Sequence, residues 1–184
     1  MPTVDVLCVC LKSTENHLIQ NLINPLLHDK TIILFLQNGI GVEEEMSLVF
    51  PQQQIAGGLA FLCSNKIGPG HIHHLDYGPI LLGAHTPDLD LTQLTALFNA
   101  AKIPTELSSS LAAARWQKLV WNIPYNGLCA LHDIDTSCVM SDPELRQRCE
   151  DIMHEVFDAA AACGSALDPA IIAKMLRNTE KMKP

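Results

Sequence analysis

The chain has 184 residues, 48% of them hydrophobic, and a formal net charge of −8 at pH 7. Such a chain can bury a core, at the upper size limit of one domain or the lower limit of two. Its acidic balance, with a pI near 5.4, argues against nucleic-acid binding, which requires a basic surface. We find no run of about 18 apolar residues and no signal peptide, and therefore expect a cytoplasmic protein with no membrane role.

The first part of the chain predicts one strand-helix-strand unit of a parallel sheet. Val4–Leu11 and Thr31–Leu36 are apolar runs of the kind that is buried on both faces between layers of helices. Between them, apolar residues recur at helical spacing over 18–26, and Ser13 or Thr14 can cap that helix. The usual right-handed crossover would make the two strands parallel.

Polar residues follow both strands at their carboxyl ends. Lys12 comes directly after the first strand, and Asn38 lies in the exit turn Gln37–Gly41 of the second. Because ligands of open α/β sheets bind beyond the carboxyl ends of the strands, both side chains are candidate cofactor or substrate contacts. A tight glycine turn without a ligand is the alternative. Three glutamates open the next helix and would repel a phosphate, so we expect no phosphate cradle there.

Residues 52–107 predict short, mainly antiparallel strands and one helix. The strands are expected at Ile55–Cys63, His71–Leu75 and Pro79–Gly83, with glycine- and proline-containing turns between them. Leu91–Ala101 has an amphipathic helical pattern, and Ile103–Leu107 is the last strand expected.

A helix beyond residue 109 carries one amine and two carboxamides at steps of four residues. These side chains, Lys118, Asn122 and Asn126, therefore share one helix face. A lysine beside amide groups suits a small, oxygen-rich substrate, because its cation can protonate or stabilise a developing oxyanion. A solvated helix face is the alternative interpretation.

Two further helices are predicted after this one. The first begins with Ser141 as its cap and Glu144 three residues later, and it ends near Cys163–Gly164. The second opens at Asp168–Pro169 and carries an apolar stripe. We therefore expect an α/β domain over residues 1–108 and an all-helical domain over residues 109–184.

Cysteines and histidines give weaker signals. The chain has seven cysteines, an odd number, and five of them lie in apolar periodic segments. Buried thiols in a reducing compartment are predicted for these five: Cys8, Cys10, Cys129, Cys149 and Cys163. His71 and His73 would share a strand face, but only Asp76 stands at a supporting spacing, so we predict no metal site.

Four segments together resemble the ketopantoate reductases, or 2-dehydropantoate 2-reductases. They are Leu11–Lys12, Leu36–Gly41, Gly68–Ile72 and Arg115–Asn126, and their order and spacing match across nearly the whole chain. The resemblance implies a partial Rossmann-like sheet followed by a helical C-terminal domain like that of 6-phosphogluconate dehydrogenase. It also implies an oxidoreductase that uses NADP to reduce 2-dehydropantoate, a small 2-oxo acid, in pantothenate and coenzyme A biosynthesis.

The resemblance also implies roles for individual residues. Lys118 resembles the family's general acid, and Asn122 and Asn126 resemble its substrate-contacting amides. In that scheme the nicotinamide passes a hydride to the ketone carbon, and Lys118 delivers a proton to the oxygen. Lys12 and Asn38 resemble the residues that meet the nicotinamide half of NADP and the substrate.

Two further positions are carried over less directly. Ser64 is the match for a cofactor contact made by backbone, although the alignment slips by about a residue there. A further substrate amide of the family falls on Thr136, which places that contact in doubt.

The chain departs from the family's pattern at both ends. It has no G-x-G-x-x-G motif, and the family's final segment with a substrate-binding serine is absent. We therefore expect an inactive fragment that binds NADP weakly and whose Val4–Leu11 strand edge is open to pairing in a homodimer. The alternatives are a reductase of another 2-oxo acid and a non-catalytic remnant or assembly module.

Overall fold

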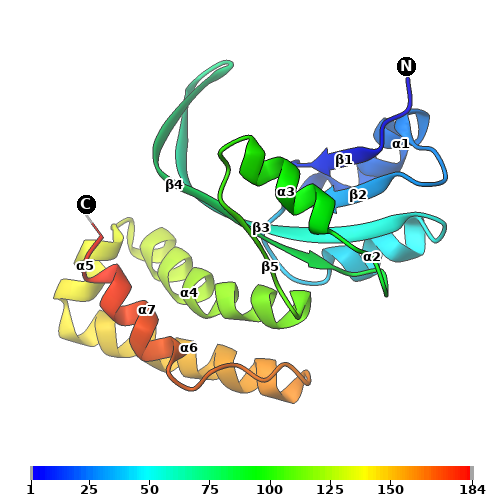
Figure 1. Ribbon diagram of the computed structural model, residues 1–184. Coiled ribbons are helices and arrows are strands. Elements are labelled where there is room, and N and C mark those ends of the chain that lie inside the picture. Colours follow the sequence, from blue (N-terminus) through cyan, green and yellow to red (C-terminus); the bar gives the residue numbers. More distant parts are fainter. Residues whose placement is uncertain (1, 183–184) are drawn as a thin grey trace. The chain divides into compact units, whose positions relative to one another are not determined.

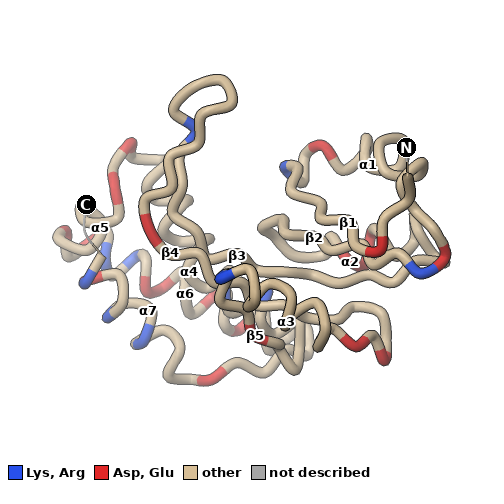
Figure 2. The backbone as a smooth tube through the Cα atoms, turned by 45° about the horizontal axis from the view of Figure 1, so that its top comes forward, with Lys and Arg blue, Asp and Glu red and all other residues tan. Residues whose placement is uncertain are grey.

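The computed structural model describes residues 2–182 and divides into two compact units, Met1–Leu111 and Ala112–Pro184 (Figure 1). The first unit is built on a mixed sheet and the second is helical, which confirms the predicted fold class. Acidic and basic residues are spread along both units (Figure 2). Within residues 2–182, no helix has the length and apolar character needed to cross a membrane.

A five-stranded sheet with the order β1-β2-β3-β4-β5 forms the centre of the first unit. The pairs β1–β2 and β2–β3 are parallel, β3–β4 is antiparallel and β4–β5 is parallel. The predicted parallel pairing of the first two strands is therefore confirmed. The strands are β1 (Val6–Val9), β2 (Ile32–Phe35), β3 (Gln54–Gly68), β4 (His71–Ala84) and β5 (Thr105–Leu107).

Helices cover both faces of this sheet, and β2 shows how the sequence specifies them. Ile33 and Phe35 belong to an apolar cluster with residues of α1 and α2, whereas the intervening Leu34 belongs to a second cluster with α3. This alternation confirms that β2 is buried on both faces. The helical segments are η1 (Ser13–Leu18), α1 (Ile19–Ile23), η2 (Asn24–Leu26), α2 (Val42–Val49) and α3 (Thr92–Ala100).

The predicted cap of the first helical segment is wrong. Lys12 is the N-cap of η1 and makes no side-chain capping hydrogen bond, and Ser13 and Thr14 lie inside the segment. The segment is also not one helix, because a short α-helix stands between two 3-10 turns, η1 and η2.

β3 and β4 continue beyond the sheet as a two-stranded arm, residues 61–78, that stands away from the other strands (Figure 1). The prediction of two short strands separated by a turn near Asp76 is wrong, since β4 is continuous. The residues expected to form the turn lie within β4, at an irregularity in its pairing with β3, where Tyr77 has φ +63° and Gly78 has φ +149°. Positive φ angles of this kind bend a strand without ending it.

β1 is an edge strand, and its position explains why the prediction fails for Cys8 and Cys10. Val9 is buried, but Cys8 and Cys10 alternate with it and are exposed. Cys163, which follows the end of α6 (Pro143–Ala162), is exposed as well. Of the five predicted buried thiols, only Cys149 is buried, and Cys129 is partly buried.

Up to residue 182, the last one that the structure describes, the second unit consists of four helices around one apolar cluster. They are α4 (Leu111–His132), whose first residue closes the first unit, α5 (Thr136–Ser141), α6 and α7 (Ile171–Thr179). α5 was not predicted. It also corrects the predicted cap of α6, because Ser141 ends α5. Asp142 is the N-cap, and its carboxylate accepts hydrogen bonds from the backbone N–H groups of Glu144 and Leu145.

Candidate active site

The predicted site residues fall into two groups, one in each unit. In the first unit, Lys12 and Asn38 follow the carboxyl ends of β1 and β2. Val9 and Phe35 are paired in register, and the Leu36 N–H donates to the Val9 carbonyl at 3.0 Å, so the two strands end side by side. The side chains of Lys12 and Asn38 are both exposed just beyond these strand ends.

A buried amide that the sequence analysis did not single out connects these two strand exits. Gln37 Nε2 donates to the Leu11 carbonyl at 2.7 Å and to Asn16 Oδ1 at 2.8 Å. Gln37 is 4% exposed and Asn16 is 9% exposed. The only sequence signal for this connection is a glutamine at the first position of the exit turn, where an apolar strand has just ended.

The turn after Asn38 brings the chain into α2. Gly39 has φ +112° and Gly41 has φ +87°, and Gly41 is the N-cap of α2. Residues with a side chain rarely adopt these angles, so the two glycines allow the turn to reverse within a few residues. Glu43 in the first turn of α2 is 2% exposed, and its carboxylate lies beside the backbone of Gly57 in β3.

Ser64 lies on the arm, where β3 pairs with His74 of β4. The parallel pairing of β3 with β2 ends at Gly57, seven residues earlier. At about 3.3 Å per residue, Ser64 is therefore up to about 23 Å along the strand from that point. Lys12 and Asn38 thus lie together at the carboxyl ends of β1 and β2, whereas Ser64 lies farther along β3.

In the second unit, α4 carries Lys118, Asn122 and Asn126 on one face, as the spacing predicted. Lys118 and Asn122 are partly buried, and Asn126 is exposed. The helix continues through Pro124. Thr136 is the first residue of α5 and is partly buried.

Two aromatic residues beside this polar face anchor α4 within its unit. Trp121 Nε1 donates to Thr179 Oγ1 at 2.9 Å, and the Tyr125 hydroxyl donates to Met140 Sδ at 2.9 Å. Tyr125 is fully buried, and the centroids of the two rings are 4.9 Å apart. These contacts tie α4 to α5 and α7 and fix the rotation of α4 about its axis, so the polar face is held in one direction.

The environment of Lys118 favours proton transfer near neutral pH. Burial of its ammonium group and, to a lesser extent, the like charge of Arg115 together lower the pKa of Lys118 to about 8. Arg115 lies three residues earlier on the same helix and is 2% exposed. A lysine whose pKa is close to the working pH can both hold a proton and give it up, which is the property of an effective general acid.

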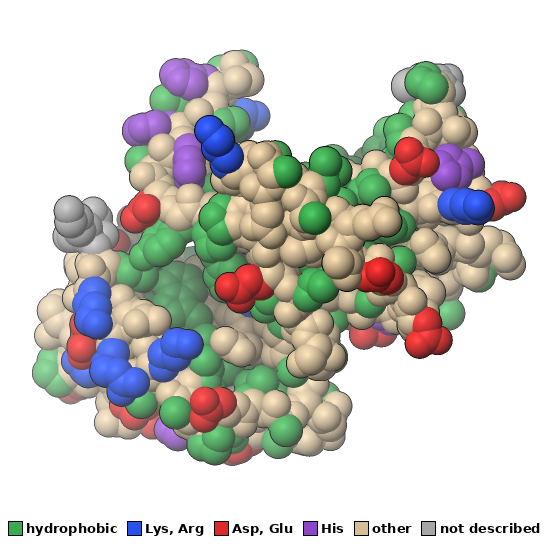
Figure 3. Space-filling view, in the orientation of Figure 1, with side chains coloured by type: hydrophobic (Ala, Val, Ile, Leu, Met, Phe, Trp, Pro, Cys, Tyr) green, Lys and Arg blue, Asp and Glu red, His purple; other side chains and the backbone are tan. Residues whose placement is uncertain are grey.

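The histidines His71, His73 and His74 lie on the exposed arm, where Figure 3 shows histidine side chains gathered. The His74 ring lies within hydrogen-bonding distance of the Asp76 and Tyr77 carbonyls, at 3.1 and 2.8 Å. Among residues 2–182, no group of three or more histidine, cysteine, aspartate or glutamate side chains is arranged to hold a metal ion.

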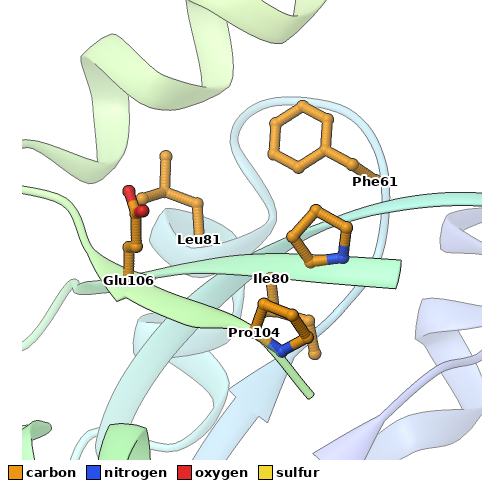
Figure 4. A pocket seen from close by; sticks show the side chains of 6 residues that line it. Phe61, Ile80, Leu81, Pro104 and Glu106 are labelled. Carbon is orange, nitrogen blue, oxygen red and sulfur yellow. The ribbon is translucent and has the colours of Figure 1, made fainter. Parts of the chain in front are cut away.

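An open hollow of about 280 Å³ lies at the base of the arm (Figure 4). Apolar side chains of β3 and β4 and the carboxylate of Glu106 on β5 surround it. None of the predicted site residues lines this hollow. Its lining residues are Phe61, Pro79, Ile80, Leu81, Pro104 and Glu106.

Comparison with known proteins gives one consistent family. The profile "Ketopantoate reductase PanE/ApbA" matches residues 1–87, and "Ketopantoate reductase PanE/ApbA C terminal" matches residues 110–184. A 2-dehydropantoate 2-reductase from Nostoc sp. is 46% identical over 191 residues, covering 100% of this chain and 60% of the relative.

Solved structures agree with this result. The crystal structure of 2-dehydropantoate 2-reductase from Geobacter metallireducens has a TM-score of 0.92 and 38% identity, and the match covers 100% of this chain and 63% of that protein. A D-mandelate dehydrogenase solved with NADH and anilino(oxo)acetate has a TM-score of 0.90 over 97% of this chain and 59% of its own. At 21% identity, this last likeness shows the fold alone. The chain spans about three fifths of the length of these relatives.

Proposed function

Because this chain belongs to the ketopantoate reductase PanE/ApbA family, we propose that it serves an NADPH-dependent reduction of 2-dehydropantoate to pantoate. The observation that carries the proposal is the polar face of α4, where a lysine with a pKa of about 8 precedes two asparagines at steps of four residues. The name of the Nostoc relative supports the substrate.

In this proposal Lys118 is the general acid. When bound, the nicotinamide supplies a hydride to the ketone carbon. The ammonium of Lys118 gives its proton to the ketone oxygen, which becomes the hydroxyl of the alcohol product, and solvent then reprotonates the amine. The amides of Asn122 and Asn126 orient the oxygens of the substrate, and the partial positive charge of their N–H groups stabilises the oxygen as it gains charge.

The residues of the first unit fit contacts to the cofactor. Lys12 and Asn38 extend beyond the carboxyl ends of adjacent parallel strands, where open α/β sheets bind their ligands. Asn38 would contact both the nicotinamide half and the substrate, and Ser64 would add a contact from β3. The preference for NADPH over NADH is part of the proposal and follows from the family.

A second candidate function is the reduction of another 2-oxo acid by the same chemistry. The D-mandelate dehydrogenase has this fold and was solved with a different oxo acid, so the fold by itself does not fix the substrate. Both functions would use Lys118, and they differ in the 2-oxo acid that the rest of the site accepts.

A substrate panel separates these candidates. Oxidation of NADPH and of NADH is followed with 2-dehydropantoate and with other 2-oxo acids, using this chain and the longest reading frame that contains it. The proposal predicts the highest kcat/KM with 2-dehydropantoate and NADPH. A higher value with another acid supports the second candidate, and a folded protein without activity on any acid favours a non-catalytic module.

A further inference from the structure

We infer that Gln37 is a positioning residue whose buried side-chain amide holds the exits of β1 and β2, and with them Lys12 and Asn38, in one fixed arrangement. The inference rests on the proposed function, because it gives Gln37 its role through two residues of the proposed cofactor site. Gln37 itself is not assigned a contact with cofactor or substrate.

The hydrogen bonds of Gln37 reach the chain both before and after Lys12. Its Nε2 donates to the carbonyl of Leu11, the residue directly before Lys12, at 2.7 Å. The same nitrogen donates at 2.8 Å to Asn16 Oδ1, inside the turn η1 that Lys12 caps. One amide therefore fixes the chain on both sides of Lys12. Since Gln37 directly precedes Asn38, it fixes the second strand exit at the same time.

These hydrogen bonds are long-range in sequence, with separations of 26 and 21 residues. A local hydrogen bond would hold one turn, whereas these two hold one turn relative to the other. Gln37 and Asn16 are 4% and 9% exposed, so water is not available to replace a lost partner. A buried amide without its partners is costly, and the paired arrangement is therefore strongly preferred.

The same two strands have a matched link at their opposite ends. Thr31 Oγ1 donates to the Val4 carbonyl at 2.6 Å, just before β2 and β1 begin, and Thr31 is fully buried. This link also joins a side chain next to β2 to a backbone carbonyl next to β1. It lies at the amino ends of the strands, away from the candidate residues. Thr31→Val is therefore the control for the loss of a buried β1–β2 link as such.

The test compares four variants in the longest reading frame that contains this chain. Gln37→Leu and Asn16→Leu remove the donor or the acceptor, Asn16→Asp keeps an acceptor of the same shape, and Thr31→Val is the control. The KM for NADPH, kcat and the thermal midpoint of unfolding are measured for each. The comparison of KM with the thermal midpoint distinguishes positioning from general stability.

We expect Gln37→Leu and Asn16→Leu to raise the KM for NADPH at least about tenfold, the factor that corresponds to 1.4 kcal/mol. The KM for NADPH of Asn16→Asp should stay within about threefold of the wild-type value, because the hydrogen bond from Gln37 is kept. Asn16→Asp would thus rescue the effect of Asn16→Leu. Thr31→Val should lower the thermal midpoint and leave the KM unchanged. If Gln37→Leu does not fold, the contrast between the two Asn16 variants carries the test.

Two results overturn the inference. One is a KM for NADPH that is unchanged in Gln37→Leu and Asn16→Leu, and the other is a rise of KM in Thr31→Val as large as in Gln37→Leu. Failure of the proposed function is a separate outcome, because then the wild-type protein itself neither binds NADPH nor reduces a 2-oxo acid.

Discussion

We predict that kcat/KM for the reduction falls as the pH rises above about 8, because Lys118 can act as an acid only while it carries a proton. The structure sets that value, since burial of the ammonium group and then the like charge of Arg115 lower the pKa of Lys118 from 10.5 to about 8. The pH at which the rate declines therefore reports the environment of one side chain.

The size of the effect follows from the fraction of protonated lysine. With a pKa of about 8, about 91% of Lys118 is protonated at pH 7 and about 9% at pH 9, so kcat/KM should fall about tenfold between them. With the ordinary pKa of a lysine, about 97% would still be protonated at pH 9, and kcat/KM would change by less than about 1.1-fold. The two cases are easily separated.

The assay measures kcat/KM from pH 7 to pH 10 at constant ionic strength. This ratio reports groups of the free enzyme, which is the state the structure describes. Lys118→Arg is the control, because a guanidinium keeps the positive charge and does not release its proton in this range. Its activity should be low at every pH. A wild-type profile that stays flat to pH 9.5, or the same decline in Lys118→Ala, would refute the reasoning.

Three predictions concern stability. Gly83→Ala should lower the free energy of unfolding by about 1–3 kcal/mol, because its new Cβ would lie 2.8 Å from the Cβ of Leu111, the first residue of α4. Gly127→Ala has open space around the new Cβ and should stabilise α4 by up to about 1 kcal/mol. Asp142→Ala should lower the free energy of unfolding by about 1 kcal/mol, because it removes the N-cap of α6, and Ser141→Ala should lower it by less than about half of that. Between pH 8 and 10.5 the unfolded chain keeps the Lys118 proton that the folded chain has lost, so the free energy of unfolding of the wild type should rise relative to that of Lys118→Met. The raised pKa values of Cys149 and Tyr125 act in the opposite direction, but they do so in both proteins and cancel in this difference.

Chemical denaturation checks all three. An increase in stability in Gly83→Ala would contradict the close contact at that glycine. If Ser141→Ala were less stable than Asp142→Ala, Ser141 would be the cap of α6, as the sequence predicted. A difference in unfolding free energy between wild type and Lys118→Met that does not rise from pH 8 to 10.5 would contradict the lowered pKa of Lys118.

Much of the fold could be predicted because its elements have strong patterns. The apolar run Thr31–Leu36 contains β2, a strand that is buried inside the sheet, and β1 pairs with it in parallel as expected. The spacing of Lys118, Asn122 and Asn126 also predicted their shared helix face, because helix geometry alone decides that.

The failures came from features that local patterns do not decide. Cys8 and Cys10 have a core-like context in sequence, but their burial depends on which strand lies at the sheet edge. The sequence around Tyr77 and Gly78 has the composition of a turn, but these residues lie within the continuous strand β4 because β4 pairs with β3 on both sides of them. Gln37 was missed because its partners are 26 and 21 residues away, and only the fold brings them together.

The measurement that tests the central claim most directly is NADPH oxidation with 2-dehydropantoate by the longest reading frame that contains this chain, as the wild type and as Lys118→Ala, with folding verified for both. The account predicts turnover by the wild type and a loss of at least about 100-fold in kcat for Lys118→Ala, at an unchanged thermal midpoint. Turnover that is the same in the two proteins would remove Lys118 from the mechanism and contradict the account.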